Sequence, residues 1–306
     1  MCVMLFPPTL APGAHVALVA PAGPLRDRQD LDRSVANVES FGWVAVPGDH
    51  VLERDGYLAG SDEHRLADLN RFLRDESIDA IWCIRGGYGA MRLLDGIDYD
   101  ALVKRPKAII GYSDITALHA ALSRRCGLVS FHGATARAHL TDVTRKSLGV
   151  TLAEPWEALT IVEPSMTPLV SGTARGRLAG GNLALVAALA GTPYAPDLDG
   201  TILMLEDVNE AVYRIDRMLT QLWLSGALCG IAGLAFGSFT EIPPPPSEDS
   251  ASGDRPLERV LEEFAKRCGV PCVSGFPMGH IDDQNTYPLG AMATLNVDER
   301  VLTIER

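Results

Sequence analysis

A serine stands where an apolar run gives way to a helical pattern. Ser113 follows the apolar run 108–110, and Ile115, Leu118 and Leu122 then repeat at helical spacing. The first amides of such a helix would point toward the serine hydroxyl, and the helix dipole favours negative charge there. An acyl-transfer nucleophile needs this environment, because its transition state places an oxyanion beside backbone N–H groups. Serine is also a favoured helix N-cap, so a structural role remains open at this point.

A glycine-rich segment, Arg85-Gly-Gly-Tyr-Gly89, follows the apolar run 80–84. Two adjacent glycines permit close backbone approach and positive φ angles. Their amides could donate to an oxyanion, a carboxylate or a phosphate. The spacing matches neither the dinucleotide fingerprint nor the phosphate-binding loop of nucleotide hydrolases, so nucleotide binding is poorly supported. A tight turn without a ligand is the simpler alternative.

Three carboxylates compete for the place of an acid that orients a histidine. Glu206 ends an apolar strand pattern and is followed by Asp207 and Glu210. Composition does not choose among them, and all three could instead complement the dipole at the start of a helix.

Three histidines are candidates for a general base. His280 follows a glycine in a turn-like apolar segment, whereas His119 and His132 flank the serine region. No His-Glu-x-x-His run or other clear metal spacing is present, so we expect no metal.

Length and charge restrict the class of protein. The chain has 306 residues, of which 47% are hydrophobic and 22% charged, as in an ordinary globular protein. Its net charge of −12 argues against a nucleic-acid or anionic-membrane partner. We recognise neither a secretion signal nor a segment long enough to span a bilayer, so we expect a cytoplasmic location. We expect the six cysteines to be reduced and structural.

The first half of the chain alternates strand and helix patterns. This alternation predicts an α/β fold with a doubly wound, mainly parallel sheet, whose ligands bind at the carboxyl ends of the strands. The expected strands are 15–20, 43–46, 80–84, 108–110 and 127–131, and the expected helices include 31–41, 62–74 and the segment after Ser113.

A second, smaller α/β domain rich in short strands is expected to follow. We predict a nucleophile-bearing domain over 1–140, a linker over 141–170 and a second domain over 171–306. Within the second domain we expect a helix to residue 190, strands 201–205 and 231–236, a helix containing Ile215, Leu219 and Leu222, and a helix over 257–268. The proline-rich segment 243–254 is expected to be an exposed loop.

Together these segments make the chain resemble the LD-carboxypeptidase family of serine peptidases, which includes muramoyltetrapeptide carboxypeptidases and microcin C self-immunity proteins. Six fragments occur in the order typical of the family. They are Val19-Ala-Pro-Ala-Gly23, Arg85-Gly-Gly-Tyr-Gly89, Gly111-Tyr-Ser-Asp-Ile-Thr116, Gly180-Gly-Asn-Leu183, Leu205-Glu-Asp207, and Gly279-His280 followed by Pro288-Leu-Gly290.

The resemblance implies residue roles and a reaction. It makes Ser113 the nucleophile, Glu206 the acid and His280 the base of a catalytic triad assembled from both domains. It also implies an oxyanion hole formed by the backbone N–H of Asp114 with that of Gly86 or Gly87. The implied reaction hydrolyses the L,D-peptide bond that releases the terminal D-alanine of murein tetrapeptides in cell-wall recycling. It requires no metal or organic cofactor, and the family resemblance makes a homodimer plausible.

Other roles remain open at the sequence level. Tyr88, Arg214 and Arg217 could contact the peptide substrate, or could simply pack or form surface ion pairs. A self-immunity enzyme that cleaves peptidyl- or aminoacyl-nucleotides would use the same triad, and Trp156 or Trp223 could then stack on adenine. A non-catalytic muropeptide-binding protein would not need all three triad residue types, and a glutaminase would need a cysteine at position 113. The sequence does not choose between lysine and diaminopimelate as the third residue of the peptide.

Overall fold

The computed structural model describes residues 4–243 and 255–306, which divide into two units. The first unit holds the residues up to Glu157 together with Asp282–Ala291 and Arg306. The second holds Ala158–Ile281 and Met292–Glu305. The predicted polar loop 243–254 lies almost entirely outside the described residues. No helix among the described residues is both long and apolar enough to cross a membrane.

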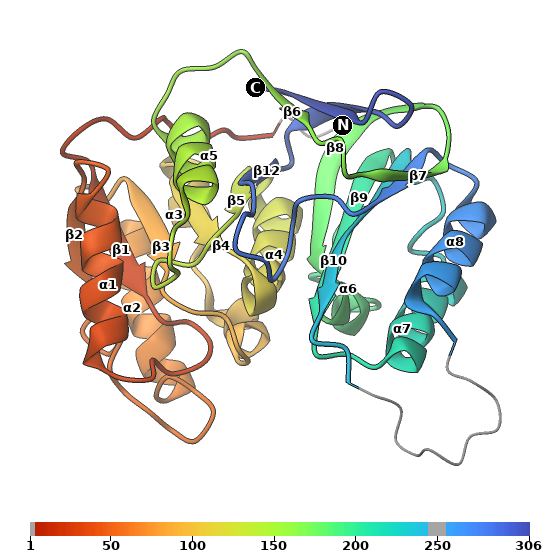
Figure 1. Cartoon of the computed structure of the whole chain (residues 1–306). Coiled ribbons are helices and arrows are strands. Elements are labelled where there is room, and N and C mark those ends of the chain that lie inside the picture. The colour runs from red at the N-terminus through yellow and green to blue at the C-terminus, as the bar shows by residue number, and fades with distance from the viewer. Residues whose placement is uncertain (1–3, 244–254) are drawn as a thin grey trace. The chain divides into compact units, whose positions relative to one another are not determined.

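A six-stranded sheet forms the centre of the first unit (Figure 1). Its order is β12-β5-β4-β3-β1-β2, and all neighbours are parallel except β12, which pairs antiparallel with β5. The strands are β1 (His15–Val19), β2 (Val44–Pro47), β3 (Ala80–Cys83), β4 (Ala108–Gly111), β5 (Ser130–His132) and β12 (Tyr287–Leu289).

Helices cover both faces of this sheet, as a parallel sheet requires. They are α1 (Arg28–Glu39), α2 (Asp62–Arg74), α3 (Tyr99–Lys104), α4 (Thr116–Cys126) and α5 (Asp142–Leu152), with 3₁₀ turns η1 (Ala90–Gly96) and η2 (Ser113–Ile115). Helices α1 and α5 pack on one face, where Val16, Trp82 and Ile110 are buried. The alternate residues of β1 and β3, such as Ala17 and Ile81, are buried on the other face.

The predicted elements of the first unit are confirmed with small shifts at their ends. Helix α2 has the predicted bounds; Ser61 caps it by accepting a hydrogen bond from the His64 N–H, and Asp62 and Glu63 occupy its first turn. The fifth strand begins at Ser130, three residues later than predicted, because Gly127 is the left-handed C-cap of α4.

An eight-stranded mixed sheet forms the centre of the second unit. Its order is β6-β14-β13-β8-β9-β10-β11-β7, and the run β8-β9-β10-β11 is parallel. The strands are β6 (Ala158–Val162), β7 (Thr167–Val170), β8 (Thr173–Asn182), β9 (Thr201–Val208), β10 (Gly233–Thr240), β11 (Cys272–Ser274), β13 (Met292–Asn296) and β14 (Val301–Glu305).

Three helices pack on one face of this second sheet. They are α6 (Leu183–Leu189), α7 (Val212–Leu224) and α8 (Leu257–Cys268), and they share an apolar core with Leu203, Leu205 and Phe236. Ile202 and Met204 point to the opposite face of β9, where they are also buried. Glu206 follows the same alternation, so it lies on the face away from these helices.

The segment predicted to be a linker, 141–170, carries regular structure instead. It contains helix α5 and strands β6 and β7. The prolines that break its periodicity lie between and within these short elements. Strands β6 and β7 are the two edge strands of a sheet, and each pairs antiparallel with its single neighbour, so their apolar runs are short. Residues 282–291, predicted to belong to the second domain, are part of the first unit through strand β12.

Candidate active site

Ser113 occupies a strained corner between β4 and α4. Its φ angle is +65°, in a region that residues with a Cβ rarely adopt. Tyr112 precedes the 3₁₀ turn that begins with Ser113, and Ile115 is the N-cap of α4. The serine therefore does not cap the helix, and the strained strand–turn–helix geometry is that of a nucleophile elbow.

The glycine-rich loop 85–89 lies against this serine. A Cβ placed on Gly86 would lie 2.9 Å from the Ser113 Cβ and 3.2 Å from its Oγ. Only glycine fits here, and its backbone comes close to the hydroxyl. Gly87 has a φ of +107°, so one glycine of the pair adopts the positive φ angle that the sequence permits. The N–H groups of Gly86 and Gly87 donate to no backbone acceptor in the described part of the chain.

Two buried side chains that sequence reasoning missed hold the loop in place. Asp114 accepts a hydrogen bond from the Ala90 N–H (2.8 Å), which ties η2 to the end of the glycine loop, and burial raises the pKa of this carboxyl to about 6. Arg65, on α2, donates to the carbonyls of Pro21 and Gly89. The sequence signal for the contact between Asp114 and the Ala90 N–H was the position of an acidic residue directly after the serine.

Glu206 and His280 form a hydrogen-bonded pair in the second unit. His280 Nδ1 lies 2.8 Å from Glu206 Oε2, and the glutamate side chain is fully buried. A carboxylate can only accept, so Nδ1 donates and the neutral ring keeps Nε2 as its basic nitrogen. The Oε1 atom of Glu206 has no hydrogen-bond partner among the described residues.

The two rival carboxylates have other partners. Asp207 points to the helix-covered side of β9, where it accepts from Asn182 Nδ2 (2.9 Å) and from the N–H of Ala184 (2.9 Å) at the start of α6. Glu210 pairs with Arg214 at 3.6 Å. The alternation of side chains along the strand therefore separates an acid that contacts histidine from an acid that supports a helix.

The two competing histidines near the serine, His119 and His132, are buried in the first unit. His119 is fully buried, and its Nε2 lies 2.9 Å from the Gly111 carbonyl while Nδ1 lies 2.8 Å from Ser130 Oγ. The carbonyl requires Nε2 to donate, so Nδ1 accepts from the serine hydroxyl. Burial lowers the pKa of His119 to about 4. His132 is also buried, against the ring of Tyr112.

Gly279 makes the Glu206–His280 contact possible. Its φ is +117°, and a Cβ there would lie 2.8 Å from Glu206 Oε2. Gly279→Ala is therefore expected to separate the pair and to lower kcat by about 10²-fold or more, because the imidazole loses its orienting partner. Steady-state kinetics with circular dichroism as a check on folding would measure this effect.

Gly269→Ala is the matched control for that substitution. Gly269 also has a positive φ, +66°, but nothing lies within 4 Å of its Cβ position. This variant should lose about 1 kcal/mol of stability and keep its activity. Equal kinetic damage from both variants would contradict the role given to Gly279.

The other predicted contact residues are exposed. Tyr88 lies edge-to-face with Tyr57, with ring centroids 5.6 Å apart. The guanidinium groups of Arg214 and Arg217 lie over the ring of Tyr213 at the start of α7. All three predicted residues have local partners, and whether they contact a substrate stays a prediction.

The two tryptophans suggested as a nucleobase platform have local partners or positions, and whether either contacts a nucleobase stays a prediction. Trp156 donates to the Thr151 carbonyl and packs under Arg306. Trp223 lies near the end of α7, about 14 Å along the helix axis from Arg214 at nine residues' rise.

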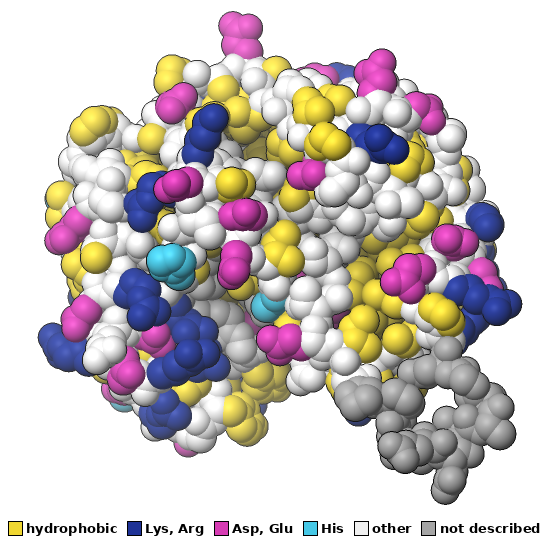
Figure 2. All heavy atoms as spheres, viewed as in Figure 1, with side chains coloured by type: hydrophobic (Ala, Val, Ile, Leu, Met, Phe, Trp, Pro, Cys, Tyr) yellow, Lys and Arg dark blue, Asp and Glu magenta, His cyan; other side chains and the backbone are white. Residues whose placement is uncertain are grey.

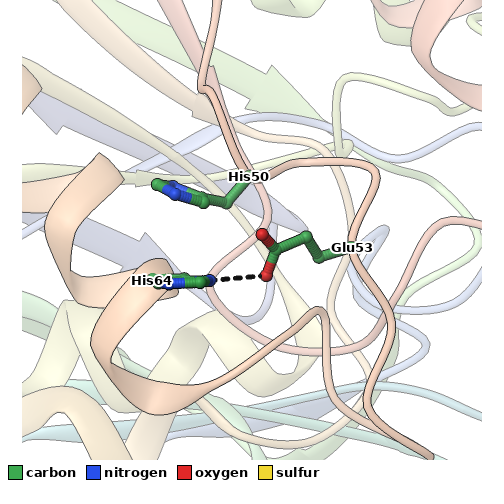
Figure 3. A group of neighbouring side chains, drawn as sticks. All are labelled: His50, Glu53 and His64. Atoms are coloured by element: carbon green, nitrogen blue, oxygen red, sulfur yellow. Dashed lines mark hydrogen bonds and ion pairs between the residues drawn. The ribbon is translucent and has the colours of Figure 1, made fainter.

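One group of side chains in the described part of the chain has metal-ligand types (Figure 3). His50, Glu53 and His64 bring ligand atoms within 4.8 Å of one another. His64 Nδ1 contacts Glu53 at 2.8 Å, His50 Nδ1 contacts Asp68 at 3.0 Å, and the two imidazole rings stack at 4.3 Å. Stacked rings do not direct two nitrogens at one point, and the carboxylates account for the contacts, so we assign no metal here.

Ser113 thus belongs to the first unit, and the Glu206–His280 pair belongs to the second. The first unit holds a pair of glycine amides beside a strained hydroxyl, and the second holds an imidazole bonded to a buried carboxylate; these are the kinds of group that acyl transfer uses.

Comparisons with known proteins find similarity to a family of carboxypeptidases. The model of the LD-carboxypeptidase N-terminal domain matches residues 16–133, and that of the C-terminal domain matches residues 175–295. A protein of Bacillus subtilis (strain 168) named "Probable murein peptide carboxypeptidase" is 39% identical over 304 residues, covering 98% of this chain and 94% of that protein.

Two further relatives carry different names, one as a carboxypeptidase and one as a self-immunity protein. The crystal structure of a muramoyltetrapeptide carboxypeptidase from Oxalobacter formigenes has a TM-score of 0.84 and 31% identity, covering 96% of this chain and 99% of that one. The microcin C7 self-immunity protein MccF of Escherichia coli is 28% identical over 304 residues, covering 89% of this chain and 87% of that protein.

Proposed function

Because the chain belongs to the LD-carboxypeptidase family, we propose that it is a serine carboxypeptidase that removes the terminal D-alanine from murein tetrapeptides. The observation that carries this proposal is the strained Ser113 beside the N–H groups of Gly86 and Gly87, which donate to no backbone acceptor among the described residues. A relative's name for murein peptides gives the substrate class.

The proposed catalytic triad is Ser113, His280 and Glu206. His280 Nε2 takes the proton of Ser113 Oγ, which attacks the carbonyl that precedes the terminal D-amino acid. Glu206 fixes the imidazole tautomer and stabilises the imidazolium. His280 then protonates the leaving amine, and water hydrolyses the acyl-enzyme. The mechanism requires the two units to bring these groups within hydrogen-bond reach in the substrate complex.

The proposed oxyanion hole uses backbone donors. The N–H of Asp114, with that of Gly86 or Gly87, binds the tetrahedral oxyanion, and one such donor is typically worth about 3 kcal/mol in the transition state. These amides need no side chain at the site, which agrees with the clash that any Cβ on Gly86 would cause.

Mass spectrometry of the reaction products tests the proposal. The full-length protein is incubated with a murein tetrapeptide, and with a peptidyl-adenylate analogue in a parallel reaction. We expect loss of one D-alanine mass from the tetrapeptide only, and no loss with Ser113→Ala. Cleavage of the nucleotide conjugate alone would assign the self-immunity activity instead. Binding without turnover of either would assign a binding protein.

A serine-directed fluorophosphonate gives an independent readout. It should add its mass to Ser113, and the labelling rate should fall in His280→Ala, because the hydroxyl then has no base. As a recycling enzyme the protein would act in the cytoplasm, and a homodimer, which the family resemblance suggests, is testable by light scattering.

A further inference from the structure

The strand order of the first unit marks a ligand-binding position next to the serine. In the order β2-β1-β3-β4-β5, the chain reverses its direction of travel between β1 and β3. Open α/β sheets bind ligands at such a switch point, beyond the carboxyl ends of the strands. The loops that leave β1 and β3 meet there, since the Gly23 N–H donates to the Gly86 carbonyl at 3.0 Å.

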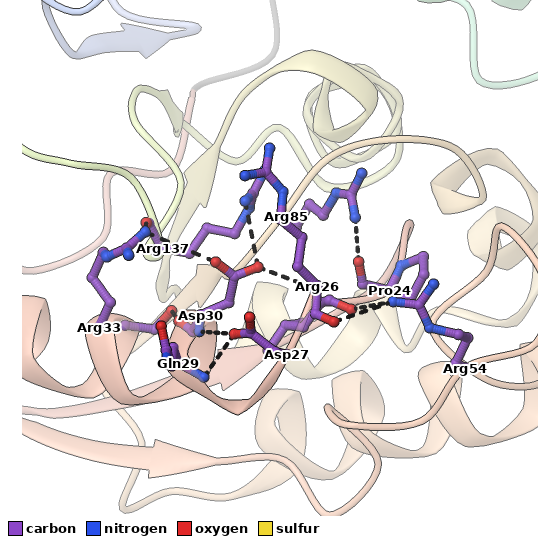
Figure 4. Close-up of polar contacts among 11 residues, drawn as sticks. Pro24, Arg26, Asp27, Gln29, Asp30, Arg33, Arg54, Arg85 and Arg137 are labelled. Carbon is purple, nitrogen blue, oxygen red and sulfur yellow. Dashed lines mark hydrogen bonds and ion pairs between the residues drawn. The ribbon is translucent and has the colours of Figure 1, made fainter.

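Arginines from four separate loops gather at this position (Figure 4). We call Arg26, Arg54, Arg85 and Arg137 the arginine cluster; they lie in the loops that follow β1, β2, β3 and β5. Figure 2 shows Lys and Arg side chains crowded at the lower left of that view, over the loop between β1 and α1. This concentration of positive charge occurs in a chain whose net charge is −12.

Backbone carbonyls fix two of these arginines. Arg54 Nη2 donates to the Leu25 carbonyl at 2.7 Å, and Arg85 Nη1 donates to the carbonyl of Pro24. Such contacts orient a guanidinium group but leave its charge uncompensated.

Few carboxylates balance the cluster. Asp30 Oδ2 lies 3.4 Å from Arg137 Nη1 and accepts from the Arg26 N–H at 3.0 Å. Asp27 instead caps α1, accepting from the N–H groups of Gln29 and Asp30. Asp30 is therefore the carboxylate that faces the cluster, and it also pairs with the peripheral Arg33 at 3.9 Å (Figure 4).

Some donors of the cluster have no partner among the described residues. Within residues 4–243 and 255–306, Arg137 Nε is buried without a hydrogen-bond acceptor, and the Arg26 guanidinium makes no hydrogen bond or ion pair. Burial, and then repulsion from the guanidinium groups of Arg137 and Arg26, lower the pKa of Arg85. Like charges are thus held together at a point where an anion would relieve their repulsion.

We propose that the arginine cluster binds anionic oxygens of the ligand, namely the free carboxylates of an acidic peptide substrate. A Cβ placed on Gly23 would lie 3.6 Å from Arg85 Nε, and one on Gly86 would lie 3.2 Å from Ser113 Oγ. Arg85, one member of the cluster, thus belongs to the same glycine-rich loop that lies against the serine. Guanidinium groups bind carboxylate and phosphate alike, so a nucleotide phosphate is the other source of the same chemistry.

This inference rests on the proposed function for its substrate, and binding is therefore measured without turnover. The full-length Ser113→Ala protein is titrated by calorimetry with a murein tetrapeptide and with the same peptide whose free carboxylates are amidated. We expect R26Q combined with R137Q to weaken binding of the acidic peptide about tenfold or more, because charge-assisted hydrogen bonds are lost. The effect of the double substitution should be smaller at high salt, because salt screens the charges. The amidated peptide should bind both proteins equally.

Arg28→Gln supplies the matched control. Arg28 is an exposed arginine at the start of α1 that pairs with Asp32 at 4.0 Å, on its own helix. Its replacement removes one positive charge near the cluster and should change neither the Kd of the acidic peptide nor that of the amidated peptide. In the active protein, the loss in R26Q/R137Q should appear in KM and leave kcat within about twofold, since the cluster binds ground state and transition state alike.

Titration with AMP distinguishes the two sources of anion. If AMP binding depends on Arg26 and Arg137 and peptide binding does not, the cluster is still an anion-binding site, but its ligand is a nucleotide. Peptide binding that is equally strong with and without the arginines would overturn the inference, even if D-alanine release is observed. Arginine-dependent peptide binding without D-alanine release would instead contradict the proposed function alone.

Discussion

Replacing Ser113 by alanine is expected to lower kcat/KM for the murein tetrapeptide by about 10⁴-fold or more while leaving its Kd nearly unchanged. The reason is that the substitution removes the attacking oxygen and leaves the backbone donors and the arginine cluster in place. Steady-state and single-turnover kinetics would measure the loss, and calorimetry would measure binding. Ser123→Ala, on the following helix, should behave as wild type.

The strain at position 113 gives this prediction a second readout. Both serine and alanine must adopt a φ of +65° there, whereas glycine does so at little cost. Ser113→Gly should therefore be as inactive as Ser113→Ala but about 1 kcal/mol more stable to denaturant. An active Ser113→Ala protein would show that Ser113 is not the nucleophile. Equal stability of Ser113→Ala and Ser113→Gly would contradict backbone strain at position 113.

Replacing Glu206 by glutamine is expected to lower kcat by about 10³- to 10⁴-fold, as loss of the orienting acid does in other serine triads. The amide can donate to His280 Nδ1, which would place the ring proton on Nε2 and abolish its basic lone pair. Kinetics across pH would measure the loss, and the rate should not recover at high pH, because the tautomer is wrong at every pH.

The same substitution should leave the fold intact. Glu206 is fully buried and its Oε1 has no hydrogen-bond partner among the described residues, so a neutral amide removes a buried charge. The thermal midpoint should stay within about 3 °C of wild type or rise. Glu210→Gln, four residues along, is the matched control and should keep full activity, since Glu210 pairs with Arg214. A Glu206→Gln protein with normal kcat would remove Glu206 from the proposed triad.

The sequence determined the elements whose signals are local. Helix α2 follows from its serine cap, its acidic first turn and the helical spacing of Leu66, Leu69 and Leu73. Strands β1, β3 and β4 follow from short apolar runs, because both of their faces are buried. The family motifs then selected the candidate residues Ser113, Glu206 and His280.

Elements stabilised by distant partners could not be predicted in this way. Helix α5 contains Gly149 and two threonines, which are weak helix formers, and it forms because Leu148 and Leu152 pack into the core of the first unit. Thr141, whose hydroxyl caps this helix, was the sequence signal available for it. Strand β12 pairs with β5, more than 150 residues away in the chain, and no local pattern specifies such a partner.

Residue types and spacing were thus sufficient to predict the turn at Ser113, the glycine loop and most helices, because hydrophobic period and backbone sterics act within a few residues. Composition and spacing left Glu206 and Asp207 as alternatives, and the family motifs favoured Glu206; the tertiary structure gives the physical reason, since strand pleating and the packing of α6 leave Glu206 and not Asp207 in contact with His280. The tertiary structure alone gathered Arg26, Arg54, Arg85 and Arg137, because the parallel sheet brings to one edge the loops that follow four of its strands.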